Sequence, residues 1–226
     1  RTPRTNHTHL PNPSPPTDLR LGAQPVIPHA SERSLMAVIA TISSSPSRTS
    51  RTDAVLSTVS TQLQRAGHVV APIVLRDLPA EPLLRGDATD PDIALAVATL
   101  GAADAVVVTT PVYRAAYGGL LKTFLDLLPQ FALEGKVVLP VATGGTPAHV
   151  LVVDYALRPV LASLAPSSIS PGWFVLADHV TFVEGGEVVL ADAAKRPLRE
   201  VTSVFLDTVA GRSLVAAGNA QREAVA

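Results

Sequence analysis

Cysteine is absent from this chain of 226 residues, which excludes disulfide bonds, thiolate zinc sites, iron–sulfur clusters and a cysteine nucleophile. Charge is also scarce, since charged residues make up 16% of the sequence and the net charge is −1. We find no basic run that would form a nucleic-acid footprint, no apolar stretch of about 18 residues and no apolar core of a secretory signal. We therefore expect a cytoplasmic protein that binds no metal, nucleic acid or membrane.

Apolar residues, by contrast, make up 47% of the sequence. That share is enough for a well-buried core and leaves apolar surface for self-association. Residues 1–33 differ from the rest, because they hold seven prolines and their few apolar residues show no period. We expect a disordered tail there, a single domain over residues 34–210, and a flexible C-terminal tail over residues 211–226.

From residue 35 on, apolar runs that predict buried strands alternate with segments that predict helices. We expect strands at 35–42, 68–75, 104–109, 136–142 and 173–176, helices at 53–66, 92–100, 118–128, 150–164 and 192–210, a hairpin at 180–190 and a polar loop at 76–90. Pro140 indicates a bulge or strand end nearby, and Pro159 a kinked or restarted helix. The alternation predicts an α/β fold with a doubly wound, five-stranded parallel sheet between two helical layers.

The helix expected from Gly118 is apolar around more than one stripe of its surface. Its apolar residues are Leu120, Leu121, Phe124, Leu125, Leu127 and Leu128. Such a helix either faces both the sheet and another subunit or is fully buried in its own chain. The first alternative predicts a homo-oligomer assembled through this helix.

In a doubly wound sheet, ligands bind at the carboxyl ends of the strands. The first loop at that edge, residues 43–52, carries five serines, two threonines and two arginines and leads into a helix N-terminus. Hydroxyls, backbone amides and the helix dipole suit a terminal phosphate. The loop has neither the Gly-x-Gly-x-x-Gly pattern nor the Gly-Lys-Ser/Thr ending of nucleotide-binding loops. An ordinary turn with helix-capping residues is the alternative.

The loops after the third and fourth strands suit a flat heterocycle. Pro111 stiffens the first of them and Tyr113 offers an aromatic face, a mixed surface of the kind that a flavin needs. Gly144 and Gly145 in the second allow the backbone to lie against a planar ring. The alternatives are a packing role for the tyrosine and a simple turn for the two glycines.

Two long runs, TPVYRAAYGGLLKTFLDLLP and LEGKVVLPVATGGTPAHVLVVDYALRPVL, resemble the NAD(P)H-dependent FMN reductases of the flavodoxin-like superfamily. The resemblance is greatest to the reductase components of two-component alkanesulfonate monooxygenases. It extends more weakly over residues 35–176. It implies a flavodoxin-like fold, FMN with NADPH or NADH, hydride transfer from nicotinamide C4 to flavin N5, and delivery of reduced FMN to a partner monooxygenase.

The same resemblance assigns the site. In the family the first loop begins Gly-Ser-Pro-Arg, whereas here Ser44 stands for the glycine and Ser47 for the arginine, with Arg48 next to it. The residues that keep the phosphate pattern are Ser45, Pro46, Ser50, Arg51 and Thr52. The residues that correspond to the isoalloxazine lining are Pro111, Val112 and Tyr113, and those that correspond to its other edge are Thr143, Gly144 and Gly145. The resemblance also implies an oligomer, a dimer or tetramer, with its interface in the segment from Tyr117 to Leu128.

Three other functions remain open from the sequence. One is a reductase that holds FMN tightly and passes electrons to quinones or azo dyes. Another is an electron-transfer module without NAD(P)H turnover, although a net charge of −1 and 4% aromatic residues differ from the strongly acidic, aromatic composition usual in flavodoxins. In the last, the first loop has lost its phosphate site.

Overall fold

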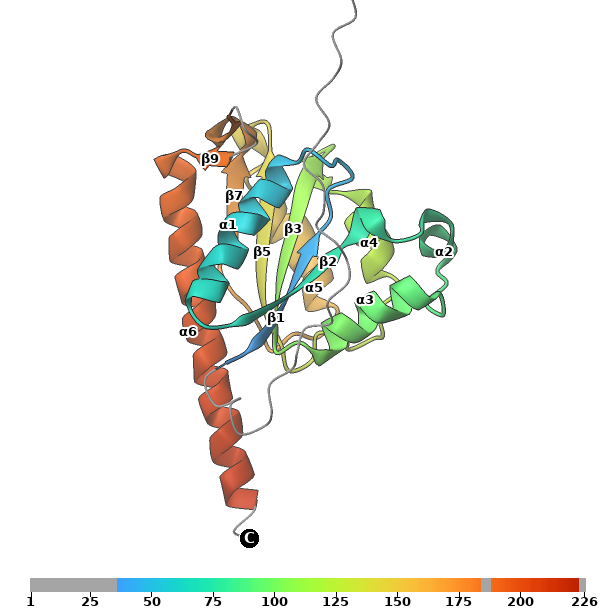
Figure 1. Ribbon diagram of the computed structural model, residues 1–226, viewed down its shortest axis with the longest axis vertical. Coiled ribbons are helices and arrows are strands. Elements are labelled where there is room, and N and C mark those ends of the chain that lie inside the picture. Colours follow the sequence, from blue (N-terminus) through green and yellow to red (C-terminus); the bar gives the residue numbers. More distant parts are fainter. Residues whose placement is uncertain (1–35, 184–187, 224–226) are drawn as a thin grey trace, which may run out of the picture.

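The computed structural model describes residues 36–183 and 188–223, with side chains of the C-terminal helix to residue 213. The predicted tail over residues 1–33 lies outside the described residues. Within them, a parallel sheet is covered by helices on both faces (Figure 1). Of the helices in this described part, none combines the length and apolar character needed to cross a membrane.

The central sheet has the strand order β2-β1-β3-β5, with β6 and β7 both beyond β5. Its strands are β1 (Val38–Ser43), β2 (Val69–Val74), β3 (Ala105–Tyr113), β5 (Val137–Gly144), β6 (Ser168–Ile169) and β7 (Trp173–Leu176). Their mutual pairings are parallel, and β1 and β5 are buried along their whole length. This is the order of flavodoxin-like folds, so the predicted α/β class and its five strand positions are confirmed.

The two helical layers each bury an apolar stripe against the sheet. On one face lie α1 (Arg51–Arg65) and α6 (Asp192–Glu223), and toward the other lie α3 (Pro91–Ala102), α4 (Gly119–Leu125) and α5 (Arg158–Ala162). In α1 the stripe predicted from the sequence, Val55, Val59 and Leu63, is fully buried. The final helix continues to Glu223, beyond the end expected at 210.

β5 runs through Pro140 in unbroken register with β3, so the bulge or strand end expected near this proline does not fall in its own strand. The strand position beyond β5 is divided there instead. β6 pairs with Val137 and Val138, and β7 begins to pair at Val141. Between the two strands Gly172 passes so close that a Cβ atom would lie 2.6 Å from the Pro140 carbonyl oxygen. A proline has no amide proton to offer a neighbouring strand, so the break falls where it disturbs the fewest hydrogen bonds.

The helix expected at 150–164 restarts before Pro159, as predicted. A turn η2 (Pro147–His149) precedes a π-helical segment η3 (Val153–Leu157), and α5 follows directly, with Pro159 in its first turn. The expected hairpin is present as β8 (Val180–Phe182) and β9 (Val188–Leu190), after a short turn η4 (Ala177–His179).

Two connecting segments also differ from the prediction. The expected loop at 76–90 contains η1 (Leu75–Asp77) and α2 (Ala80–Arg85), because Leu75 and Leu83 anchor it to the core. The strand expected to end at 109 continues as β3 to Tyr113 and folds back into β4 (Ala116–Tyr117). The two residues between them, Arg114 and Ala115, have φ angles of 51° and 60°, the left-handed geometry of a tight hairpin. Neither residue type signals such a turn.

The surroundings of α4 bear on the two alternatives for its apolar surface. Leu121, Phe124 and Leu125 are buried against the core of their own chain. Packing within the subunit therefore accounts for these three residues, while Leu120 and Leu127 are only partly buried. The helix ends at Leu125 rather than at 128.

Candidate functional site

The three predicted loops meet at one edge of the sheet because their strands end in register. Ser43 pairs with Thr109, and Pro111 pairs with Thr143. The first and third loops also touch directly, since the hydroxyls of Thr52 and Thr143 are hydrogen-bonded to each other. The residues predicted on these loops therefore form one continuous surface at the carboxyl ends of β1, β3 and β5.

The first loop is held by its own hydroxyls. Ser50 is the N-cap of α1, and its side chain accepts a hydrogen bond of 3.1 Å from the Asp53 amide, which is the role that the capping alternative proposed. Ser45 accepts from the Ser47 amide at 3.3 Å. Ser45, Ser50 and Thr52 are buried while residues 46–49 are exposed. The loop thus presents a rim of exposed backbone above a base of hydroxyl groups.

Ser44, which stands where the family has glycine, fits beneath this loop. Its hydroxyl donates to the Thr109 carbonyl at 2.7 Å and its amide donates to the same oxygen at 3.3 Å. The side chain is completely buried and turned toward β3. The extra atoms therefore brace the loop from below and do not fill the space above it.

Arg51 connects the loop to the β8–β9 hairpin. Its Nε donates to the Val180 carbonyl at 3.2 Å. The side chain lies at the exposed start of α1, where a helix dipole already favours negative charge. The hairpin thus fixes a cation next to the predicted phosphate position.

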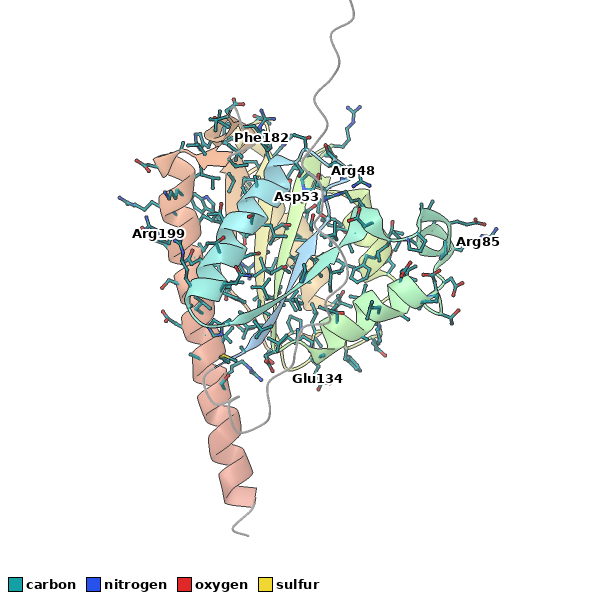
Figure 2. All side chains as sticks on the ribbon, viewed as in Figure 1. Arg48, Asp53, Arg85, Glu134, Phe182 and Arg199 are labelled. Carbon is teal, nitrogen blue, oxygen red and sulfur yellow. The ribbon has the colours of Figure 1, made fainter. Side chains whose placement is uncertain are left out.

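The sequence analysis missed Asp53 and Arg76. Arg76 Nη1 lies 2.5 Å from Asp53 Oδ2 and 3.4 Å from the Ser45 carbonyl oxygen, and the Ser43 hydroxyl donates to Asp53 Oδ1. Figure 2 shows Asp53 with Arg48 at the loop end of the sheet, and Glu134 at the other end. The available signal was the carboxylate in the first turn of a helix that follows a presumed phosphate loop.

The second loop is the β3–β4 hairpin. Pro111 is buried in β3, Val112 is partly buried, and Tyr113 is 51% exposed. The Gly118 amide donates to Thr110 Oγ1 at 2.9 Å and ties the end of the hairpin to β3. Tyr113 therefore belongs to a hairpin that is hydrogen-bonded back to β3, and about half of its surface is exposed to solvent.

The third loop gives its two glycines different tasks. A Cβ atom on Gly144 would lie 2.7 Å from Phe174 Cζ and 3.3 Å from Val112 Cβ, so this glycine is required by internal packing. A Cβ atom on Gly145 would have no atom within 4 Å. The side-chain face of Gly145 is therefore open, whereas that of Gly144 is closed. Thr143 is buried beside them.

Two titratable groups whose pKa values are lowered, His68 and Lys136, lie at the opposite end of the sheet. Burial lowers the pKa of His68, which precedes β2, and that of Lys136, which precedes β5. Lys136 Nζ donates to the carbonyls of Gly101 and Ala103 at 2.9 and 2.6 Å. A hollow of about 280 Å³ beside it is lined by Asp104, Glu134 and Arg212 among others. These groups stabilise the base of the sheet, far from the three loops.

In a comparison with known proteins, residues 37–181 match the family model described as NADPH-dependent FMN reductase. An FMN reductase (NADPH) of Pseudomonas putida is 39% identical over 176 residues, which cover 77% of this chain and 89% of that protein. An FMN reductase (NADPH) of Escherichia coli is 45% identical over 136 residues, 60% of this chain and 71% of that protein.

Solved structures agree with these relatives. The apo form of an NADH:FMN oxidoreductase superposes with a TM-score of 0.69 at 39% identity, covering 76% of this chain and 89% of that one. A flavodoxin of Streptococcus pneumoniae, at 16% identity and a TM-score of 0.50 over 76% of this chain and 99% of that one, shares the fold alone.

Proposed function

This chain belongs to the family of NADPH-dependent FMN reductases, and we propose that it reduces FMN across the carboxyl ends of β1, β3 and β5 and releases the product to a partner monooxygenase. The chain is an oxidoreductase that uses NAD(P)H and FMN. The cofactors, when bound, supply hydride transfer from nicotinamide C4 to flavin N5. The protein's task is to hold and orient them.

The first loop would hold the phosphate of FMN. The hydroxyls of Ser45, Ser50 and Thr52 line its base, Pro46 stiffens its rim, and Arg51 adds a cation fixed by the hairpin. The start of α1 adds the positive end of its dipole. This set of neutral donors and one fixed cation fits a phosphate dianion at the end of a flexible ribityl chain.

The second and third loops would hold the ring. Pro111, Val112 and the exposed Tyr113 offer one mixed apolar surface, while Thr143 and the backbone at Gly144 and Gly145 offer the other edge. Backbone amides near the pyrimidine part of the ring would stabilise negative charge on the reduced flavin. The observation that carries the proposal is the hydroxyl contact between Thr52 and Thr143, because it makes the phosphate end and the ring end a single site.

Release of the reduced flavin is supported by the openness of the ring end. Tyr113 is half exposed and Gly145 has empty space above it, so a bound ring would keep a route to solvent. Two further relatives are named NADH-dependent FMN reductases SfnF and SfnE. We propose that this chain, acting in the cytoplasm, treats FMN as a substrate that it hands on.

The test is the FMN dependence of NAD(P)H oxidation by the purified protein. A colourless protein whose rate saturates with added FMN supports the proposal. A yellow protein with ping-pong kinetics on quinones or azo dyes supports the reductase with tightly bound FMN. A protein that binds FMN but does not oxidise NAD(P)H supports the electron-transfer module.

We propose further that the chain is a homo-oligomer. The predicted interface from Tyr117 to Leu128 lies beside η3, and near it Val150, Leu151 and Tyr155 are 50%, 59% and 78% exposed. Exposed apolar groups in such a cluster favour self-association. Sedimentation equilibrium checks this, and a monomer at micromolar concentration contradicts it. We also propose that residues 34–210 form the reductase domain, although α6 continues past its end to Glu223, where a flexible tail was expected.

A further inference from the structure

A carboxylate lies at the end of the site where FMN phosphate is proposed to bind. Asp53 is the third residue of α1, directly after Arg51 and Thr52, and its side chain is 24% exposed. A helix N-terminus favours one negative charge, and two negative charges there repel each other. An unpaired Asp53 would therefore compete with the phosphate for the same favourable potential.

Arg76 pairs with the Asp53 carboxylate. It comes from η1, after β2, and its side chain is 19% exposed. Its Nη1 contacts both Asp53 Oδ2, at 2.5 Å, and the Ser45 carbonyl oxygen, at 3.4 Å. The other carboxylate oxygen of Asp53 accepts from Ser43. Both carboxylate oxygens of Asp53 are thereby occupied, one by the last residue of β1 and the other by a residue that follows β2.

The remaining charges around this pair do not replace Arg76. Asp77 Oδ1 lies 4.0 Å from Arg76 Nε and 4.0 Å from Arg48 Nη2, and Arg48 is 89% exposed, where solvent screens its charge. Arg76 Nε is buried without a hydrogen-bond partner among the described residues, which is unfavourable by itself. The guanidinium group therefore contacts Asp53 and Ser45 although its own Nε is left without a hydrogen bond.

We propose that Arg76 is a positioning residue that neutralises Asp53, and that this pair sets how strongly the first loop favours a phosphorylated flavin over riboflavin. The inference rests on the proposed function, since it takes the FMN phosphate to bind at this loop. With Arg76 in place the loop offers the phosphate the hydroxyls and the free charge of Arg51. Without Arg76, the Asp53 carboxylate repels the phosphate and the Ser45 carbonyl loses its anchor.

A purely structural ion pair predicts a different outcome. If the pair only stabilises the packing of β2 against α1, then removing either partner loosens the loop and weakens the binding of FMN and riboflavin alike. If the pair controls charge, then Asp53→Asn removes a negative charge and frees Arg76, so FMN binds more tightly. Arg76→Gln has the opposite effect, and riboflavin, which has no phosphate, responds to neither.

The experiment measures dissociation constants of FMN and riboflavin from quenching of flavin fluorescence. The proteins are the wild type, D53N, R76Q and the double variant D53N/R76Q, each checked by thermal unfolding. We expect R76Q to raise the Kd for FMN about tenfold and D53N to lower it about threefold to tenfold, which is the effect of one charge-assisted interaction. The Kd of the double variant for FMN should lie within about threefold of the wild-type value, and the Kd for riboflavin should lie within about twofold of its own wild-type value in all four proteins.

The inference is overturned if D53N weakens FMN, or if the variants change FMN and riboflavin by the same factor. Should R76Q fail to fold, D53N and the double variant still decide between the two outcomes. A wild type that binds neither flavin contradicts the proposed function instead. A wild type that binds FMN, with variants that do not discriminate, leaves the proposed function intact and removes only the role of Arg76.

Discussion

Replacing Gly144 by alanine should destabilise the protein, whereas the same change at Gly145 should leave its stability intact. The added methyl group at 144 would lie 2.7 and 2.9 Å from two ring atoms of Phe174, which is buried against Ala142 and Val153. Overpacking of this kind costs about 1–3 kcal/mol, or a fall of about 3–10 °C in Tm for a chain of this size. Thermal unfolding of the unliganded protein, followed by circular dichroism, measures it.

Gly145 is the matched control, because its Cβ position has no atom within 4 Å. Its Tm should stay within about 2 °C of the wild type, while a methyl group in the space proposed for the ring should raise the Kd for FMN about tenfold. Equal destabilisation by both changes would refute the assignment of packing to Gly144 alone. An unchanged FMN affinity in G145A would show that this loop does not face the flavin.

Three further predictions test other parts of the account. Tyr113→Ala should leave Tm unchanged, because the residue is half exposed, and should raise the Kd for FMN about threefold to tenfold through lost ring contact. A fall in Tm without a change in FMN binding would show that Tyr113 has a packing role. Ser50→Ala should lower the free energy of unfolding by about 1 kcal/mol through loss of the N-cap and also weaken FMN, as urea unfolding and a flavin titration would measure; loss of stability alone would restrict Ser50 to capping. His68 accepts a hydrogen bond from the Ala37 amide as a neutral imidazole, and burial lowers its pKa from the ordinary 6.5. Below pH 6.5 the unfolded chain therefore takes up a proton that the folded chain does not, so the free energy of unfolding falls as the pH falls toward the lowered pKa. His68→Asn should flatten this pH dependence, and an unchanged dependence would contradict the role of His68.

The alternation of apolar runs was enough to predict the sheet and its layers. Buried parallel strands such as β1 and β5 carry no alternating pattern that could be confused with a surface strand. Pro140 and Pro159 also marked real features, since the missing amide proton of proline restricts where it can lie. These inferences succeeded because each depends on a local physical property of the residue.

The parts that were missed depend on distant contacts. The Arg114–Ala115 turn has positive φ angles that neither residue type signals, so the extension of β3 to Tyr113 could not be inferred. The pairing of Asp53 with Arg76 joins residues 23 positions apart that become neighbours only when β2 lies beside β1. The packing of Phe174 against Gly144 was also missed, because the sequence does not reveal which side chain lies against that Cα atom.

A crystal structure of the protein with FMN tests the central claim most directly. The account predicts the phosphate within hydrogen-bond distance of Ser45, Ser50 and Thr52, with the ring beside Tyr113 and over Gly145. A flavin bound at another edge of the sheet, or a first loop whose hydroxyls all turn inward and leave the phosphate in solvent, would contradict it.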